Sequence, residues 1–308
     1  MSSQLQSSTT RGYVLVTAAY NEEIHIERTI QSVIAQTILP LKWVIVSDGS
    51  TDRTDEIVLR YSKDHSFITL SRITDEHPRN FAAQVMAINH GFTLLKDLDF
   101  EFIGNIDADI SFAPTYYETL LERFACDVEL GCAGGFICEE SKGVFTDRLG
   151  NSTSSVAHAV QLFRKSCFDV AGPYQVLEFG GPDWVAEVRA RQFGWKVLSF
   201  QDLKVNHFRP TASAGGVMRG RLRQGRMDHA MGSLVLFECL KCLRRFDESP
   251  RLLGALLRFS GFMIAYLRGE PRLVPDDFVA FLRQEQRQRL RALVGLRSTT
   301  HSLDSFRA

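Results

Sequence analysis

The sequence predicts an α/β fold, with a doubly wound, mainly parallel sheet flanked by helices and followed by a helical C-terminal region. Two observations carry this prediction. Through the first two thirds of the 308 residues, short apolar runs alternate with longer segments of helical spacing. After about Thr211 the strand pattern stops and the rest looks helical. We therefore expect a polar tail at 1–11, a sheet domain at 12–210 and a helical region at 211–308.

The strand candidates are short runs rich in β-branched and aromatic residues. In chain order they are Tyr13–Ala19, Lys42–Ser47, Ser66–Ile73 and Phe100–Ile106. Segments with apolar residues at helical spacing separate them, at 22–36, 51–62 and 79–95. The second of these opens with a Thr/Asp capping signal. Strands that alternate with helices in this way favour a parallel sheet with crossover helices.

The composition is that of an ordinary globular protein, with 44% hydrophobic and 23% charged residues. The formal net charge is zero, which gives no support to a nucleic-acid partner. The charge is uneven, however. Residues 211–308 hold 17 Lys/Arg and 9 Asp/Glu, a balance of 17 − 9 = +8, so the first 210 residues carry 19 − 27 = −8. Either the basic region faces an anionic partner such as a membrane surface, or it is a solvated helical surface.

The cysteines and the hydropathy of the sequence indicate the cellular compartment in which the protein works. Among the six cysteines only Cys239 and Cys242 have metal or redox spacing, and no second pair accompanies them, so we expect reduced structural thiols. The polar start lacks the apolar core of a signal peptide. The stretch Leu252–Leu267 is interrupted by Arg258 and is shorter than the ~20 residues of a spanning helix. We expect a buried or interfacial helix, and a cytoplasmic protein that is at most peripheral at the inner face of a membrane.

Polar and acidic residues follow three predicted strands where each strand stops. The first strand is followed by AAYNEE (18–23), the second by DGSTDRT (48–54) and the fourth by DAD (107–109). In a doubly wound sheet, ligands bind beyond the carboxyl ends of the strands. Two carboxylates as close as Asp107 and Asp109 repel each other, whereas a divalent cation turns that repulsion into coordination. A solvated turn would explain one such motif, but three together indicate a ligand site.

These motifs resemble those of the family-2 glycosyltransferases of GT-A fold, which transfer sugars from nucleotide diphosphates. The likeness covers roughly Gly12 to His207. It lies in two nucleotide-contacting loops, a metal motif and a segment that begins with the catalytic base, at TAAYNEE (17–23), VIVSDGSTDRT (44–54), NIDADI (105–110) and GGPDWVAEVRARQFGWKV (180–197). At the last motif the family usually has Glu-Asp. Here the first member is Pro182, so only Asp183 carries over.

The resemblance implies a nucleotide-diphosphate sugar as donor and Mn²⁺ or Mg²⁺ as the metal. The residues that would line the base and ribose are Ala19, Tyr20, Asn21 and Glu22, with Asp48 on the nucleobase. Asp48 could instead cap the helix that follows, or Thr51 or Asp52 could take that role. Asp109 would coordinate the cation directly. Asp107 would hold ribose, or the metal through water.

His207, in VNHFRP after a predicted strand, is the candidate third metal ligand, and the alternative is a satisfied surface histidine. Asp183 is the expected general base for a single displacement that inverts the anomeric centre. An N-cap role is its alternative, and Glu187, one helical turn later, is the second candidate for the base.

Four arginines follow the sheet domain and are candidates for clamping the diphosphate: Arg219, Arg221, Arg223 and Arg226. The planar guanidinium suits phosphate oxygens, and Gly220 and Gly225 would allow this segment to move. We expect such a role for one or two of them, with Arg219 and Arg223 as the choices. A solvated helix face is the alternative.

The sequence thus predicts a metal-assisted glycosyltransferase in polysaccharide or glycolipid synthesis, with a glycan or lipid-linked acceptor. A sugar nucleotidyltransferase would normally have a Gly-rich phosphate loop near the first strand, and TAAYNEE has none. A non-catalytic carbohydrate-binding protein of the same fold would not need Asp107, Asp109 and Asp183. A nicotinamide dehydrogenase is excluded, since no G-x-G-x-x-G follows the first strand.

Overall fold

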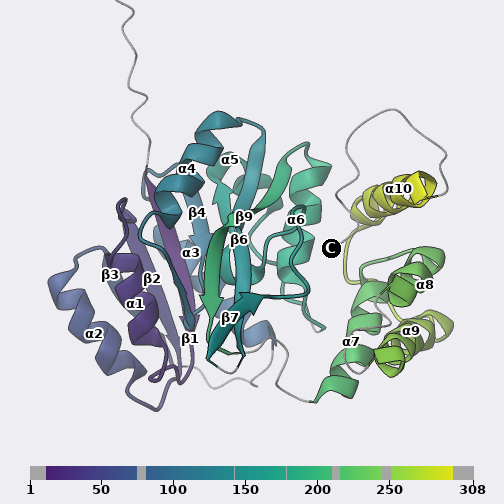
Figure 1. Ribbon diagram of the computed structural model, residues 1–308, viewed down its shortest axis with the longest axis horizontal. Coiled ribbons are helices and arrows are strands. Elements are labelled where there is room, and N and C mark those ends of the chain that lie inside the picture. Colours follow the sequence, from purple (N-terminus) through teal and green to yellow (C-terminus); the bar gives the residue numbers. More distant parts are fainter. Residues whose placement is uncertain are drawn as a thin grey trace, which may run out of the picture.

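The structure is a computed structural model that describes residues 12–74, 81–141, 143–177, 179–209, 216–244 and 251–293. These residues form a nine-stranded sheet with helices on both faces, and a group of helices from the C-terminal region lies beside it (Figure 1). The strands are β1 (Tyr13–Ala19), β2 (Lys42–Asp48), β3 (Ile68–Ile73), β4 (Phe102–Asn105), β5 (Ile110–Phe112), β6 (Leu130–Ser141), β7 (Val144–Asp147), β8 (Leu162–Arg164) and β9 (Lys196–His207).

The sheet has the strand order β3-β2-β1-β4-β8-β6-β9-β5, with β7 paired to β6. The first four strands in this order are parallel, β8 is antiparallel to both of its neighbours, and β5 is antiparallel to β9. The predicted α/β fold is therefore confirmed, and its parallel part is the N-terminal half of the sheet. Beyond β4 the sheet is mixed, and the alternation of strands with helices did not predict that part.

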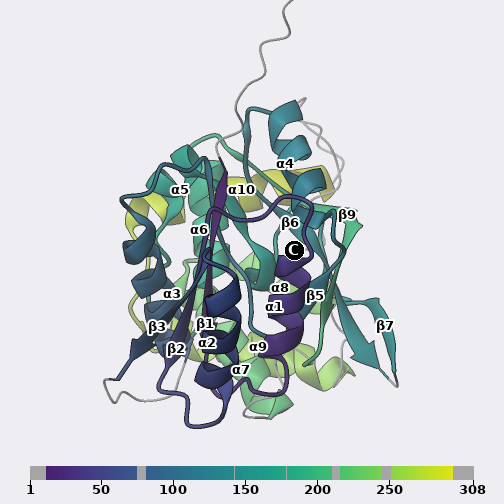
Figure 2. The same cartoon turned by 90° about the vertical axis from the view of Figure 1, so that its left-hand side faces the viewer.

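The helices of the sheet domain are α1 (Ile26–Ile34), α2 (Thr54–Asp64), α3 (Phe81–Leu95), α4 (Tyr116–Cys126), α5 (Lys165–Ala171) and α6 (Pro182–Gln192), and a 3-10 turn, η1, spans His158–Val160. In Figure 2 the parallel strands lie between α3 on one side and α1 on the other. The main core fills these layers with the apolar side chains of β1, β2 and β4. All six cysteines are unpaired.

The C-terminal region is helical, as predicted, with α7 (Val217–Ala230), α8 (Val235–Arg244), α9 (Arg251–Leu267) and α10 (Asp276–Leu293). Helix α10 packs on α6, and apolar residues of both helices join Met231 in a second buried cluster. Helices α7 and α9 cross closely at Gly225 and Gly261, where a Cβ atom would collide with backbone of the other helix. The structure thus gives Gly225 a packing role at this close crossing, while the expectation that it allows movement stays a prediction.

The predicted apolar stretch Leu252–Leu267 forms most of α9 and has two faces. Arg258, which interrupts it, is buried and pairs with Asp228 of α7 and Glu238 of α8. The other face of α9 is exposed and apolar. Within the described residues, every helix falls short of the length and hydrophobicity needed to cross a membrane.

Candidate active site

Strand pairing brings the first two predicted loops together. Strand β1 lies between β2 and β4, with Ala19 opposite Ser47 and Val16 opposite Asn105, so three carboxyl ends meet at one edge of the sheet. The Asn21 backbone has a positive φ of 54°, and its side-chain oxygen accepts a 2.8 Å hydrogen bond from the Thr51 N–H. The loop after β1 is thus fixed to the loop after β2.

The helix-capping role considered for Asp48 belongs to residues that follow it. Arg53 is the N-cap residue of α2, and Asp52 supports this end of the helix from one residue earlier, because its carboxylate accepts the N–H of Thr54, the first residue of α2, at 2.9 Å. Its second oxygen accepts the Glu23 N–H at 3.0 Å. Asp48 ends β2 and is buried. Its nucleobase role stays a prediction of the sequence.

Asp107, Asp109 and His207 converge as predicted. Strand β5 pairs with β9 in a register that sets Ile110 opposite His207, so Asp109 lies beside the imidazole. The His207 Nε2 atom is 3.2 Å from Asp109 Oδ1. One ligand atom from each residue lies within 4.8 Å of the others. Among the described residues, no other cluster of three or more His, Cys, Asp or Glu side chains is arranged to hold a metal ion. Two carboxylates and an imidazole form a donor set that fits a divalent cation such as Mn²⁺.

Arg209 is a site residue that the sequence analysis missed. Its Nε donates to Asp109 Oδ2 at 2.6 Å, and its Nη2 donates to Glu22 Oε1 at 2.5 Å. Burial alone would raise the pKa of Asp109, but the hydrogen bonds from His207 and Arg209 outweigh it and hold that pKa below its usual value. Arg209 lies in VNHFRP, the segment that contains His207, so the sequence held it close to a predicted metal ligand. Strand β9 ends at His207, however, and the alternation of a strand therefore does not predict where the Arg209 side chain points.

Asp107 has further neighbours that the sequence did not indicate. The Gln84 side chain donates to its Oδ1 at 3.4 Å, and His158 Nδ1 lies 3.7 Å from the same oxygen. Burial would lower the pKa of His158, but the hydrogen bond and charge of Asp107 raise it overall. His158 belongs to η1, in a connection that carries no strand or helix signal, so nothing in the sequence places it here.

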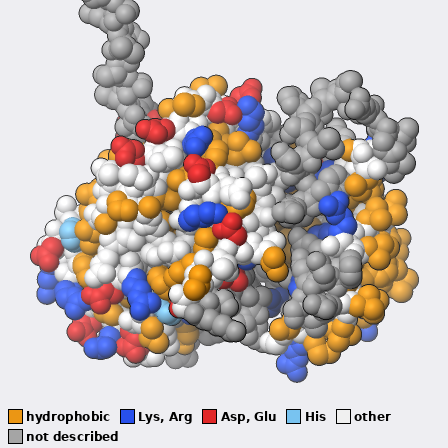
Figure 3. Space-filling view, in the orientation of Figure 1, with side chains coloured by type: hydrophobic (Ala, Val, Ile, Leu, Met, Phe, Trp, Pro, Cys, Tyr) orange, Lys and Arg blue, Asp and Glu red, His pale blue; other side chains and the backbone are white. Residues whose placement is uncertain are grey.

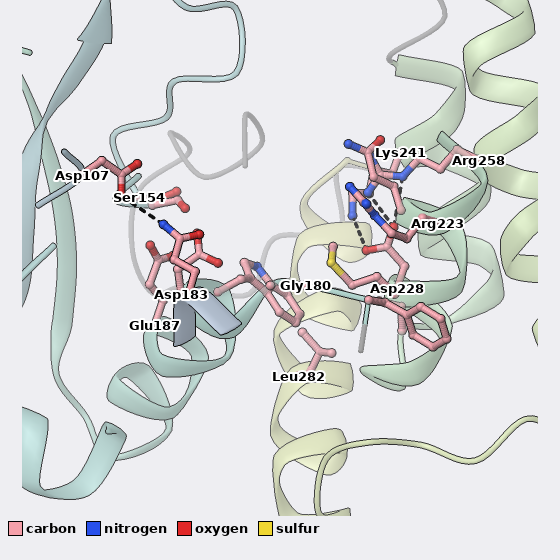
Figure 4. Close-up of a pocket in the computed structure, with 18 of the residues that line it drawn as sticks. Asp107, Ser154, Gly180, Asp183, Glu187, Arg223, Asp228, Lys241, Arg258 and Leu282 are labelled. Carbon is pink, nitrogen blue, oxygen red and sulfur yellow. Dashed lines mark hydrogen bonds and ion pairs between the residues drawn. The ribbon is translucent and has the colours of Figure 1, made fainter. Parts of the chain in front are cut away.

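Asp183 lies in the first turn of α6 and faces the same cleft as Asp107 (Figure 4). The N-cap of that helix is Gly181, in a left-handed conformation with φ 85°. The capping alternative for Asp183 is therefore wrong. Glu187 follows one turn later and is almost fully buried. Its Oε1 accepts the Val156 N–H at 2.6 Å, and burial raises its pKa to about 8.

These residues line a cleft of about 700 Å³ between the sheet domain and the C-terminal helices. Asp107, Asp183 and Glu187 lie on one wall, and Arg223 and Lys241 lie on the opposite wall (Figure 4). The predicted residues that line the cleft are Glu22, Asp107, Asp109, Asp183, Glu187, His207 and Arg223. The others, Ala19, Tyr20, Asn21, Asp48 and Arg219, lie outside its lining.

Arg226 and Arg221 both contact neighbouring side chains. Arg226 forms an ion pair with Glu270 at 3.0 Å and lies over the Phe179 ring. Arg221 donates to the Gln224 side chain at 3.3 Å. Arg219 is exposed in the first turn of α7. Among the four, only Arg223 contributes to the lining of the cleft.

A family model described as glycosyl transferase family 2 matches residues 14–174, more than half of the chain. The chain is 28% identical over 126 residues to the poly-beta-1,6-N-acetyl-D-glucosamine synthase of Staphylococcus aureus (strain COL). It is also 28% identical over 127 residues to the synthase of that name from Staphylococcus epidermidis. Both matches take 40% of this chain and only 28% of the synthase, so the chain spans less than a third of these relatives.

Two solved structures are similar over most of the chain. A mannosyltransferase from Pyrobaculum calidifontis in complex with GDP-Man and Mn²⁺ has a TM-score of 0.55 at 16% identity, covering 94% of this chain and 84% of that one. S. aureus TarS 1–349 in complex with UDP-GlcNAc has a TM-score of 0.54 at 12% identity, covering 84% of this chain and 92% of that one. At such identities the likeness shows the fold alone.

Proposed function

The chain belongs to glycosyl transferase family 2, and from this premise we propose that it transfers a sugar from a nucleotide-diphosphate sugar to an acceptor hydroxyl with inversion. The observation that carries the proposal is the convergence of Asp107, Asp109, His207 and Asp183 on one cleft. These residues come from three separate parts of the chain. A solvated turn or a helix cap would not require them to meet.

The donor nucleotide binds at the carboxyl ends of β1 and β2, with Asp48 on the base and residues 19–22 beside the base and ribose. The connected loops after these strands support this, since their mutual hydrogen bonds hold the two segments in one arrangement. Arg223 is the better candidate for a diphosphate contact because it lines the cleft, whereas Arg219 does not. The structures with GDP-Man and UDP-GlcNAc support a nucleotide-sugar donor.

Asp109 and His207 would hold a Mn²⁺ or Mg²⁺ ion, and Asp107 would contact it directly or through water. When bound, such a cation neutralises the diphosphate and stabilises the charge that develops on it as it leaves. Arg209 already carries a positive charge at Asp109 and Glu22. A cation must therefore share Asp109 with this guanidinium. The Mn²⁺ in the mannosyltransferase structure supports the choice of metal class.

Asp183 is the general base that takes the proton from the acceptor hydroxyl as its oxygen attacks the anomeric carbon. Glu187 is the alternative base. Its pKa of about 8 leaves it mainly protonated at neutral pH, and its Oε1 already accepts the Val156 N–H. A protonated, buried carboxyl is a poor proton acceptor. Asp183 is therefore the preferred assignment.

The function is tested by screening the purified protein against nucleotide sugars with Mn²⁺ and measuring release of nucleotide diphosphate. With an active donor, Asp183→Asn should lower turnover by about 10²–10⁴-fold, because the amide cannot accept the proton. Donor affinity, measured by calorimetry, should hardly change. If Glu187→Gln abolished turnover while Asp183→Asn kept wild-type activity, the base would be Glu187.

The acceptor is a glycan or a lipid-linked sugar, and the reaction belongs to polysaccharide or glycolipid synthesis. The partial likeness to poly-beta-1,6-N-acetyl-D-glucosamine synthases supports a glycan product. We also propose a cytoplasmic protein that binds peripherally to the inner face of a membrane. The positive balance of residues 211–308 and the exposed apolar face of α9 support this location.

A further inference from the structure

A group of buried polar side chains lies behind the candidate active site. Asn105, Gln161 and Glu187 are 1% exposed and Tyr174 is 2% exposed. They come from the end of β4, the residue before β8, the second turn of α6 and the connection between α5 and α6. We call these four side chains the polar network. Buried polar groups that satisfy one another fix the arrangement of the segments that carry them.

Tyr174 is at the centre of the polar network. Its hydroxyl lies 2.5 Å from the side-chain oxygens of both Asn105 and Gln161. Burial raises the pKa of Tyr174 well above its usual value, so the hydroxyl keeps its one proton and donates it to one of these oxygens at a time. The nitrogens of the two amides donate to the backbone carbonyls of His158 and Val156. Neither amide can therefore turn away from the hydroxyl without losing a hydrogen bond.

One end of the polar network lies against the metal motif. Asn105 precedes Asp107 by two residues, and its N–H donates to the Gln161 carbonyl at 3.0 Å. The Asp107 N–H donates to a carbonyl of η1 at 3.1 Å. The His158 imidazole, whose Nδ1 is 3.7 Å from Asp107 Oδ1, packs beside the Tyr174 ring with the ring centroids 5.3 Å apart. Tyr174 thus supports the metal motif through two neighbours.

The other end of the polar network lies on the helix that carries Asp183. Gln161 donates through Nε2 to Glu187 Oε1 at 3.2 Å, and the same oxygen accepts the Val156 N–H at 2.6 Å. Glu187 follows Asp183 by one turn of α6. Figure 4 shows Asp107, Asp183 and Glu187 on the same wall of the cleft. The polar network therefore joins the two segments that present Asp107 and Asp183 to the cleft.

The backbone of Tyr174 is held independently of its hydroxyl. The Asn89 side chain of α3 donates to the Tyr174 carbonyl at 2.7 Å and accepts the Tyr174 N–H at 3.1 Å. The ring also packs against Phe92 of the same helix. A phenylalanine at this position would keep these contacts. Only the link between Asn105 and Gln161 would be lost.

We propose that Tyr174 is a positioning residue for sugar transfer, whose hydroxyl fixes the helix of Asp183 relative to the metal motif of Asp107. This inference rests on the proposed function, because a base and a metal site must act together on one pair of substrates only if transfer occurs there. Displacing a reacting group by about 1 Å can cost about 10²-fold in rate. Tyr174 is not among the residues that line the cleft, so it acts through Asn105 and Gln161.

The kinetic test compares Tyr174→Phe with Tyr13→Phe, using a donor from the nucleotide-sugar screen. Tyr13 is the matched control, because it is fully buried, begins β1 at the end opposite the site and donates its hydroxyl to the Ile38 carbonyl at 2.7 Å. We expect Tyr174→Phe to lower kcat by about tenfold or more, with little change in KM for the donor or in Mn²⁺ affinity. Tyr13→Phe should keep the wild-type kcat. Equal kcat values in the two variants, or weaker donor binding without a fall in kcat, would overturn the proposal.

A second variant tests the link from its other side. Gln161→Met keeps the approximate shape of the side chain but cannot accept from the Tyr174 hydroxyl or donate to Glu187. It should lower kcat as Tyr174→Phe does. The double variant should lose little more than either single variant, because both substitutions break the same link. Losses that multiply in the double variant would contradict a shared network.

Failure of the proposed function has a different signature, because hydrogen exchange can be measured without a substrate. Amide exchange in residues 156–161 and in the first turns of α6 should become faster in Tyr174→Phe but not in Tyr13→Phe. If the wild type consumes no nucleotide sugar but exchange changes in this way, the link through Tyr174 stands and the transferase activity falls. If sugars are transferred and Tyr174→Phe keeps the wild-type kcat, the transferase stands and this inference falls.

Discussion

Asp109 connects His207, Arg209 and Glu22 in one group of charged side chains. One of its oxygens contacts His207 and the other accepts from Arg209, which in turn reaches Glu22. Replacing this carboxylate by an amide keeps the shape but removes the charge that a cation needs. The residue therefore combines metal binding with the positioning of Arg209.

We expect Asp109→Asn to weaken Mn²⁺ binding by at least tenfold and to abolish nearly all transfer. Chelation of the metal should do the same to the wild type. The binding constant can be measured by titration calorimetry with Mn²⁺ alone, so that it does not depend on a known donor. Asp202→Asn is a suitable control, since Asp202 is exposed and does not line the cleft. Full activity in excess chelator would refute the metal assignment.

Glu187 should make stability depend on pH. Its pKa is raised from 4.5 to about 8 by burial, so below pH 4.5 the carboxyl is protonated in the folded and unfolded chains alike. Between these values the unfolded chain loses the proton while the folded chain keeps it. The free energy of unfolding therefore falls as pH rises through this window, by at most about 1.4 kcal/mol per pH unit.

Glu187→Gln should remove this contribution, because the amide retains an oxygen for the Val156 N–H and cannot ionise. Urea unfolding at pH 5, 7 and 9 would measure the effect. We expect the slope of stability against pH to be shallower in the variant than in the wild type. An equally steep slope in both proteins would show that Glu187 is ionised in the folded state.

The acidic residues of the candidate site were accessible from the sequence, whereas several of their partners were not. Asp107, Asp109 and His207 lie at strand ends, and the ends of the predicted strands are where a ligand site is expected. His158 contacts Asp107 from a connection without periodicity, and the structure brings it there through tertiary packing. Arg209 was present in the motif that drew attention to His207. It lies two residues beyond the end of β9, so strand periodicity could not predict the direction of its side chain.

At the scale of elements, the close crossing of α7 and α9 depends on glycine. A Cβ at Gly225 would collide with the carbonyl of Arg258, and one at Gly261 would collide with the backbone of Leu222. Both helices contribute residues that line the cleft. The crossing therefore positions Arg223 and Arg258 relative to each other. The sequence contained these glycines, but it did not show that they faced one another across two helices.

Gly225→Ala should destabilise the protein by about 1–3 kcal/mol, because the added methyl group forces the two helices apart. Gly220→Ala is the matched control in the same helix, since a Cβ there meets nothing within 4 Å. That change should be neutral or stabilising by up to about 1 kcal/mol, through higher helix propensity. Thermal or urea unfolding of both variants would measure this. Equal effects of the two substitutions would argue against a tight crossing.

At the scale of the whole molecule, the pattern of strands and helices was enough to predict the parallel half of the sheet and the helical C-terminal region. It did not predict β8 and β5, which are three residues each and pair antiparallel with partners far along the chain. Nor could it predict that α10 packs on α6, because apolar periodicity indicates a buried face without naming its partner.

The outer surface of the C-terminal helices carries a concentration of exposed apolar side chains. Figure 3 shows hydrophobic side chains gathered over the region where α8 and α9 lie. We define this as the outer apolar face, and its large exposed members are Leu236, Leu243, Leu252, Leu253, Leu256, Ile264, Tyr266 and Leu267. The exposed residues Arg244 and Arg268 directly follow two of these leucines. Apolar side chains with arginines at their edge suit the headgroup layer of an anionic membrane.

We expect the protein to co-sediment with vesicles that contain anionic lipid, and to be released by high salt because the electrostatic part is screened. The double substitution Leu253→Ser and Leu256→Ser should weaken binding, since each buried leucine contributes roughly 1.5–3 kcal/mol. Leu149→Ser is the control, because Leu149 is 93% exposed but belongs to the sheet domain. Less protein should co-sediment with neutral vesicles than with anionic ones. If the protein does not bind anionic vesicles at low salt, the membrane proposal is wrong. If the protein instead forms a concentration-dependent dimer that the double substitution abolishes, the outer apolar face binds a second copy of the chain.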